Sequence, residues 1–282
     1  MSIIWLGDVS STNPLFVGNK AANISILYND YKIPPGFVIP PINEIRMENG
    51  VIVVPPQYSD NIAWSYHKLC EVSGVKNVSV AVRSSALDED AQGSSFAGQH
   101  DTYLNIRGDD EVRDAISQCW LSSYSKHALS YREHLGLDDN KETMPVLIQQ
   151  MIESDVSAVV FSINPINKNN NEIYINSTFG LGESLVGGTV NPDTHIIDKS
   201  SSSIISKHIS RKTVLTAFNV QGTEEVDLSS EMQNKPSIDQ SQALKLGKLA
   251  IELETRMGWP VDLEVAYKDN ELYLLQCRPI SS

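Results

Sequence analysis

A lysine lies at the start of a predicted helix near the beginning of the chain. Gly18-Asn19-Lys20 leads into residues 21–27, which the sequence predicts to be helical. The first N–H groups of a helix lack partners and carry partial positive charge, so they attract an anion, and a lysine beside them adds a full charge. A turn glycine beside a solvated lysine would give the same pattern, and the fragment is much shorter than a Walker-type phosphate loop. Lys20 is therefore one candidate for binding phosphate.

An arginine ends a short predicted strand in the same half of the chain. Residues 78–82 have the pattern of a buried strand, and Arg83 follows them directly. An arginine at the carboxyl end of such a strand suits bidentate contact with phosphate oxygens. The loop predicted over 84–99 contains small residues around Gly98, which let backbone N–H groups come close to an anion. A structural ion pair between Arg83 and the acidic run at 88–90 is the alternative.

Four polar side chains alternate along the last two predicted strands. Asp262 and Glu264 lie on one face of the first strand, and Gln276 and Arg278 lie on one face of the second. We expect a three-residue connection, which pairs even numbers with even numbers and puts all four groups on one sheet face, whereas a two-residue turn would separate them. Carboxylate and amide oxygens suit Mg²⁺. A polar hairpin face turned to solvent is the alternative.

Short strands alternate with helices along the chain and predict a mixed α/β (α+β) fold. A polar stretch at 138–143 predicts a boundary between an N-terminal lobe, 1–143, and a C-terminal lobe, 144–282, which contains the hairpin at 261–278. A plausible capping box at Ser237-Ile238-Asp239-Gln240 opens the last predicted helix. The predicted helices are 21–27, 62–73, 110–135 and 237–257, and predicted strands include 37–39, 78–82, 146–148, 156–163, 172–176, 194–197 and 204–208.

Composition restricts the class of protein further. The chain has 282 residues, with 22 basic and 35 acidic side chains and a net charge of −13, which argues against general nucleic-acid binding. No apolar run approaches the roughly 20 residues of a membrane helix, and the first residues do not resemble a signal peptide. The three cysteines lack metal-type spacing. We therefore expect a cytoplasmic protein without a membrane or nucleic-acid partner. The acidic excess does not argue against a local basic pocket for a phosphate-bearing small molecule.

These clusters occur in the order of a known family. The chain resembles, over nearly its whole length, the ATP-binding domain at the amino end of pyruvate phosphate dikinase, phosphoenolpyruvate synthase and rifampin phosphotransferase. Each matching fragment is weak alone, but seven occur in the family's order. They are Gly18-Asn19-Lys20-Ala21-Ala22-Asn23, residues 33–39, residues 80–105, Ile148-Gln149-Gln150-Met151, residues 177–183, Val190-Asn191-Pro192-Asp193, and Asp262-Leu263-Glu264 with residues 275–279.

The resemblance implies an ATP-grasp-like fold, in which two α/β lobes clamp ATP. It also implies roles for particular residues. Lys20 and Arg83 would contact the nucleotide phosphates, and Arg278 the transferred phosphoryl groups, so these three would be the catalytic residues. Gly98 and Thr102 would belong to a loop over the phosphates. Gln149 would lie near the adenine, and Glu264 and Gln276 would hold Mg²⁺.

Members of the family transfer the β-phosphoryl group of ATP to a histidine on a separate mobile domain and release AMP. The resemblance therefore implies a phosphotransferase whose partner is a phosphohistidine carrier supplied in trans, because no histidine here has the carrier context. His100 falls in the loop, where a polar loop residue is the simpler interpretation. We expect a free-standing ATP module or a fragment of a longer protein. An ATP-dependent kinase or ligase acting directly on a small molecule, and a non-catalytic nucleotide-binding subunit, are the alternatives.

The chain departs from the family's usual sequence at the segment that contains Lys20. The family usually has Gly-Gly-Lys-Gly where this chain has Gly18-Asn19-Lys20-Ala21. Loss of two glycines restricts the backbone of the turn and changes how closely it can approach a phosphate.

Overall fold

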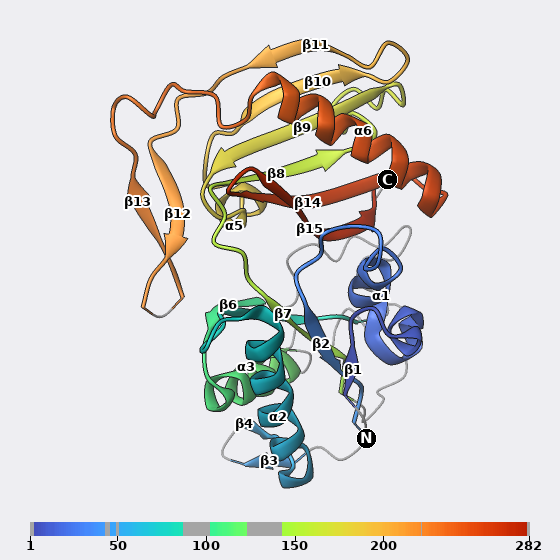
Figure 1. The fold of residues 1–282 in the computed structure, drawn as a ribbon, viewed down its shortest axis with the longest axis vertical. Coiled ribbons are helices and arrows are strands. Elements are labelled where there is room, and N and C mark those ends of the chain that lie inside the picture. Colours follow the sequence, from blue (N-terminus) through green and yellow to red (C-terminus); the bar gives the residue numbers. More distant parts are fainter. Residues whose placement is uncertain are drawn as a thin grey trace. The chain divides into compact units, whose positions relative to one another are not determined.

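The structure is a computed structural model that describes residues 3–42, 46–48, 51–86, 102–122, 143–220 and 222–280. It contains both helices and sheets, which confirms the predicted mixed α/β class (Figure 1). The chain forms two compact units. The first contains Met1–Asp30 and Pro34–Met151, and the second contains Tyr31–Ile33 and Ile152–Ser282.

The division differs in detail from the predicted one at 143/144. The sequence assigns residues 144–151 to the second lobe, but strand β7 (Val146–Gln150) lies inside the sheet of the first unit. It pairs with β2 (Gly36–Ile39) on one side and β5 (Val80–Ser84) on the other. A polar stretch indicates a linker from local composition alone. The partners of the next strand are set by long-range pairing, which composition does not reveal.

The first unit is built on a five-stranded sheet in the order β1-β2-β7-β5-β6, with β1 at Ile4–Trp5 and β6 at Thr102–Ile106. Helices α2 (Pro56–Ser73) and α3 (Asp109–Ser122) cover one face of it. Burying each large apolar side chain there stabilises the fold by about 1.5–3 kcal/mol. The buried residues of this core include Phe37, Ile39, Val80, Val82, Val146 and Ile148 of the sheet, and Ile62, Tyr66, Leu69, Val112, Ile116 and Trp120 of the helices.

Three smaller elements complete the first unit: η1 (Val9–Thr12), α1 (Pro14–Ser25) and the hairpin of β3 (Arg46–Glu48) and β4 (Val51–Val53). The predicted helix over 110–135 corresponds in its first part to α3, and its remainder from 123 lies outside the described residues.

The second unit is built on a six-stranded antiparallel sheet in the order β11-β10-β9-β8-β14-β15. Helix α6 (Gln240–Met257) packs across one face, where Gly247 allows close approach to Ile197. Odd-numbered residues of β9 and β10 face this helix, so their even-numbered neighbours face the other way. The strands are β8 (Val156–Phe161), β9 (Glu172–Phe179), β10 (Asp193–Asp198), β11 (Ser203–His208), β14 (Val261–Lys268) and β15 (Glu271–Pro279). A short helix α5 (Glu183–Val186) and a ribbon of β12 (Val214–Phe218) and β13 (Thr223–Asp227) complete the unit.

The start of α6 differs from the prediction by two residues. Asp239 is the N-cap, and it exchanges hydrogen bonds with Gln242 in a capping box. The sequence placed this box at Ser237 and Gln240, because serine and aspartate are both good caps and lie two residues apart. Ser237 instead makes long-range hydrogen bonds to Asp193 on β10.

A histidine is buried in the second unit on the face that α6 covers. The His195 side chain is fully buried, and neither ring nitrogen has a hydrogen-bond partner among the described residues. Burial, helped by the nearby Lys207 ammonium and opposed by Asp193, lowers the pKa of His195 below its ordinary value of 6.5. The folded protein therefore holds this imidazole neutral under conditions in which the unfolded chain protonates it.

We expect the free energy of unfolding to fall as the pH drops below about 6.5. In that range His195 binds a proton in the unfolded chain but stays neutral in the folded protein. His195→Leu removes this contribution. Chemical denaturation of both proteins between pH 7.5 and 5.5 measures the difference in slope. His67→Gln, on the exposed side of α2, is the control, and equal slopes for His195→Leu and the wild type would contradict the prediction.

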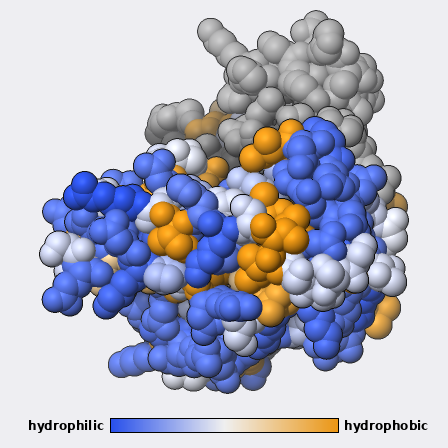
Figure 2. Space-filling model, turned by 90° about the horizontal axis from the view of Figure 1, so that it is seen from above, coloured by the Kyte–Doolittle hydropathy of each residue, from blue (hydrophilic) through white to orange (hydrophobic). Residues whose placement is uncertain are grey.

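The surface of the protein is mainly hydrophilic on one face. Hydrophilic residues predominate on the face seen in Figure 2, and hydrophobic residues form only small patches there. In the described parts of the chain, no helix combines the length and apolar character that crossing a membrane requires.

Candidate functional site

The segment around Lys20 is closed by the chain's own hydrogen bonds. Gly18 interrupts α1 with φ of 73° and ψ of 167°, and the helix continues beyond it. The backbone N–H of Ala21 donates to Ser85 Oγ at 3.1 Å, and Ser85 Oγ donates to the Val17 carbonyl at 2.7 Å. The backbone N–H of Asn19 donates to the carbonyl of Ala86, the residue that follows Ser85. These two amides, which follow the break at Gly18, therefore have acceptors within the chain, and their binding of an anion stays a prediction.

The Lys20 side chain is fixed at the end of β5. Its ammonium donates to the carbonyl of Ser84 at 2.8 Å, and the side chain is half-buried. Ser84 follows Arg83 directly, so two of the predicted phosphate-binding residues lie at the same end of one strand. A lysine ammonium has three donors, and this bond uses one of them. The role of Lys20 toward phosphate stays a prediction.

Three predicted residues share one face of the first sheet. Arg83 on β5 pairs directly with Thr102 on β6 and with Leu147 on β7. Gln149 lies two residues beyond Leu147, and side chains two apart in a strand point the same way. This face is the one opposite α2 and α3, because Val82 and its neighbours on the other face form the core. The structure therefore brings Arg83, Thr102 and Gln149 together. Gly98 and His100 lie outside the described residues.

Gln149 is enclosed within the first unit. Its side chain is buried, and the amide nitrogen donates to the carbonyl of Pro34 at 3.2 Å. Pro34 precedes β2, to which β7 is paired. The bond fixes the amide and directs its carbonyl oxygen away from Pro34. An adenine role for Gln149 remains a prediction.

The four polar residues of the C-terminal hairpin pair even with even, as expected, but the turn that connects the two strands is shorter than expected. Asp262 is directly opposite Arg278, and Glu264 is directly opposite Gln276. The predicted three-residue connection is wrong, because Lys268 pairs with Glu271 across a two-residue turn. Both turn residues, Asp269 and Asn270, have positive φ values of 50° and 63°, as a type I′ turn requires.

A β-bulge restores the even-with-even pairing that the short turn would have broken. The register shifts between Glu264 and Val265, whose partners are Gln276 and Leu274, so Leu275 is the extra residue. One extra residue in one strand turns every later side chain of that strand to the other face. The four polar groups therefore share the face opposite α6. The sequence interpretation of their arrangement holds, although the turn that produces it differs.

The hairpin face holds an ion pair next to two side chains whose oxygen atoms could bind a metal ion. Arg278 Nε donates to Asp262 Oδ2 at 2.8 Å, with the carboxylate nearly buried and the guanidinium partly exposed. Glu264 is half-buried and Gln276 is buried. A carboxylate and an amide oxygen from opposing strands are suitable ligands for Mg²⁺, which is usually held by one or two carboxylates together with phosphate oxygens. The donor chemistry therefore fits the predicted metal, with Arg278 placed to hold an anion beside it.

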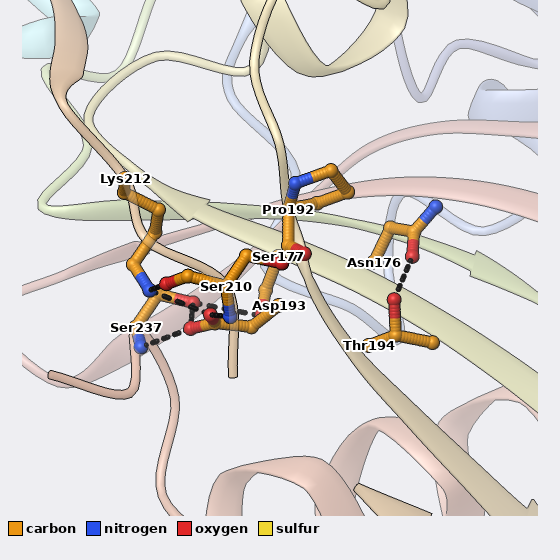
Figure 3. Close-up of polar contacts among 8 residues, drawn as sticks. All are labelled: Asn176, Ser177, Pro192, Asp193, Thr194, Ser210, Lys212 and Ser237. Atoms are coloured by element: carbon orange, nitrogen blue, oxygen red, sulfur yellow. Dashed lines mark hydrogen bonds and ion pairs between the residues drawn. The ribbon is translucent and has the colours of Figure 1, made fainter. Parts of the chain in front are cut away.

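A buried ion pair that sequence reasoning missed organises the other side of the second sheet (Figure 3). Asp193 and Lys212 are both fully buried, with 2.5 Å between Oδ1 and Nζ. Asp193 also accepts hydrogen bonds from the N–H of Ser210 at 2.9 Å and from the N–H and Oγ of Ser237 at 2.7 and 2.8 Å. Lys212 donates to the Ser210 carbonyl and lies over the ring of Phe179. The group ties the segments before β12 and before α6 to β10.

One signal for this ion pair was present in the sequence. Asn191-Pro192-Asp193 is among the matching fragments, but nothing nearby in the sequence indicates that its aspartate is buried. Its cation lies 19 residues away in an irregular segment.

Comparison with known proteins defines the family. Residues 42–282 match the model for the pyruvate phosphate dikinase AMP/ATP-binding domain. The chain belongs to this family. It is 33% identical to a probable phosphoenolpyruvate synthase of Methanocaldococcus jannaschii over 99% of the chain. It is 38% identical to the phosphoenolpyruvate synthase of Pyrococcus furiosus over 81% of the chain, and 34% identical to an uncharacterized phosphotransferase of Bacillus subtilis over 94%.

The chain spans only 27%, 29% and 33% of the lengths of these three relatives. Among solved structures, it resembles a D-alanine–D-alanine ligase from Helicobacter pylori with a TM-score of 0.39 and 14% identity, over 93% of this chain and 54% of that one. It resembles the protein PH1788 from Pyrococcus horikoshii with a TM-score of 0.44 and 11% identity, over 95% and 92%. These structural likenesses are slight, so the sequence match alone defines the family.

Proposed function

We propose that the chain is the ATP-binding part of an ATP-dependent phosphotransferase. The observation that carries the proposal is the hairpin face on which Glu264 pairs with Gln276 and Asp262 with Arg278. This face combines oxygen ligands for Mg²⁺ with a guanidinium for phosphate, in a chain that belongs to a family of AMP/ATP-binding domains. The grouping of Arg83 with Thr102 on one sheet face of the first unit also supports it.

The proposed reaction transfers the β-phosphoryl group of ATP to a histidine on a separate carrier domain or protein. The unprotonated ring nitrogen of the histidine attacks the β-phosphorus, the bond from that phosphorus to the α–β bridging oxygen breaks, and AMP leaves, while the other ring nitrogen releases its proton to water. The histidine then carries the β- and γ-phosphates together. Water or phosphate attacks the γ-phosphorus, the bond from that phosphorus to the β–γ bridging oxygen breaks, and the β-phosphoryl group stays on the histidine. Such transfers depend mainly on positioning and on neutralising charge. Lys20, Arg83 and Arg278 supply positive charge in this proposal, and Glu264 and Gln276 hold the Mg²⁺ that supplies the rest.

A carrier-dependent assay tests the proposal. The full chain is incubated with Mg²⁺, ATP labelled in the β-phosphate, and a histidine-carrier domain of the family. We expect AMP and an acid-labile labelled carrier in equal amounts. Glu264→Gln keeps the shape of the side chain but removes its charge, and we expect it to weaken ATP binding on the order of tenfold with Mg²⁺ present. Without Mg²⁺, we expect the variant and the wild type to bind ATP with equal affinity.

Glu231→Gln is the matched control, because it removes one negative charge from an exposed loop of the same unit. We expect it to leave both the Mg²⁺-dependent affinity and AMP formation unchanged. ADP as the only product would contradict the transfer and favour a kinase acting directly on a small molecule. Binding of Mg·ATP without any product in the presence of the carrier would favour a non-catalytic subunit.

A further inference from the structure

A second polar site lies on the same sheet face as the hairpin residues. It is a groove of about 520 Å³ on the outer strands of the second unit, within the usual size range of small-ligand sites. We propose that this groove binds the phosphate group of a small second ligand, separately from ATP. The residues that carry the argument are Asn176, Asn191, Thr194, His208 and Arg211.

Strand register connects the groove to the hairpin. Gln276 pairs with Glu264, and Glu264 with Val159 on β8. Val159 pairs with Asn176 on β9, Asn176 with Thr194 on β10, and Thr194 with His208 on β11. One row of side chains therefore crosses all six strands on the face opposite α6. Adjacent strands lie about 4.8 Å apart, so Asn176 is about 10 Å from Glu264, which leaves room for two ligands on one face.

The groove presents a fixed hydrogen-bond donor. Thr194 Oγ1 donates to Asn176 Oδ1 at 3.0 Å, and this bond fixes which end of the amide faces the threonine (Figure 3). The amide nitrogen of Asn176, with its two N–H groups, therefore points away from Thr194. A donor oriented in advance loses little conformational entropy when it binds an acceptor such as a phosphate oxygen.

The charge of the groove favours an anion. Among the described residues, its lining contains Arg211 and His208 but no acidic side chain, although the whole chain carries a net charge of −13. The nearest carboxylate along the chain, Asp193, is fully buried and neutralised by Lys212. Arg211 donates through Nε to Gln233 Oε1 at 2.9 Å, which steadies the guanidinium while its terminal nitrogens can take part in other bonds.

The rim of the groove is held in place by buried bonds. Ser210 Oγ donates to the carbonyl of Pro192 at 2.7 Å, and the Ser210 N–H donates to Asp193. Both sides of the rim are thus joined through the buried ion pair with Lys212 (Figure 3). A preformed groove with an oriented amide donor and a cationic rim is the arrangement expected of a phosphate site.

Phosphorus NMR of the full chain tests the proposal with two probes, inorganic phosphate and glycerol 3-phosphate, in buffer without Mg²⁺ or nucleotide. We expect saturable binding of at least one probe, and the stronger of the two identifies whether free phosphate or a phosphate ester is preferred. Asn176→Asp keeps an acceptor for Thr194 but replaces the amide donor with a negative charge. It should weaken this binding on the order of tenfold or more, and Arg211→Gln should weaken it as well.

Asn270→Asp is the matched control, because it adds the same charge at the exposed hairpin turn and should leave probe binding unchanged. Mg·ATP affinity is measured on each variant, so failure of the ATP site and failure of the groove are distinguishable. Absence of saturable binding for both probes overturns the proposal. So does binding that Asn176→Asp leaves intact, or binding that ATP displaces competitively.

Discussion

Replacing Gly18 with alanine is expected to destabilise the first unit by on the order of 3–5 kcal/mol. Its φ of 73° and ψ of 167° lie in a region that is essentially restricted to glycine. An added Cβ would also lie 1.3 Å from the carbonyl oxygen of Ser85, which is backbone and cannot move aside like a side chain. Both effects act where the hydrogen bonds of Ser85 hold the segment that carries Lys20.

Calorimetry of the full chain measures this effect as the shift of the first unit's transition. A loss of that size corresponds to roughly 6–20 °C for a unit of about 150 residues. Gly74→Ala is the control, because Gly74 has a comparable φ of 67° at the end of α2 but open space around its Cβ position. It reports the cost of the left-handed backbone alone, about 1 kcal/mol. Equal losses for the two variants would show that contact with Ser85 does not constrain Gly18.

The Gly18 segment shows how far sequence reasoning reaches. Glycine and the following helical run predict a turn and a helix, because both are local preferences. The hydrogen bonds that occupy the helix start come from Ser85, 64 residues from Ala21, and no local pattern predicts them. The hydroxyl of a serine has no preferred partner until the fold brings one near.

The hairpin shows a different limit. Alternation predicted correctly that Asp262 and Glu264 share one face of their strand, and that Gln276 and Arg278 share one face of theirs, since period two is a property of any extended strand. The turn length was predicted wrongly, and the bulge at Leu275 compensates for it. A bulge leaves little trace in a sequence of alternating polar and apolar residues. The shared face of all four residues therefore arises because the bulge offsets the shorter turn, and only the alternation within each strand was predictable from the sequence.

The groove was missed for a topological reason. Its row of side chains crosses strands β9, β10 and β11. The segments that connect these strands in the sequence differ in length. Only the register of each pair aligns Asn176, Thr194 and His208. Single polar residues on half-exposed strands are common, so none of the three is conspicuous in the sequence.

Replacing Lys212 with methionine is expected to destabilise the second unit by about 3–5 kcal/mol, because it leaves the Asp193 carboxylate buried without its counter-charge. Both side chains have an exposure of 0%. The three remaining hydrogen-bond donors, from Ser210 and Ser237, compensate only in part. Chemical denaturation of the second unit, followed by near-ultraviolet circular dichroism, measures the loss.

Two comparisons separate a buried charge from a lost contact. Adding Asp193→Asn to Lys212→Met removes the orphaned charge, so the double variant should recover a large part of the lost stability. Lys268→Met breaks the exposed ion pair with Asp155, where about 1 kcal/mol or less is expected. If Lys212→Met cost no more than Lys268→Met, the buried pair would not hold the rim. Asp193 anchors Ser210 on that rim, so one wall of the groove would then not be fixed by the ion pair. Any loss of phosphate binding in Asn176→Asp would have to arise without that fixed wall.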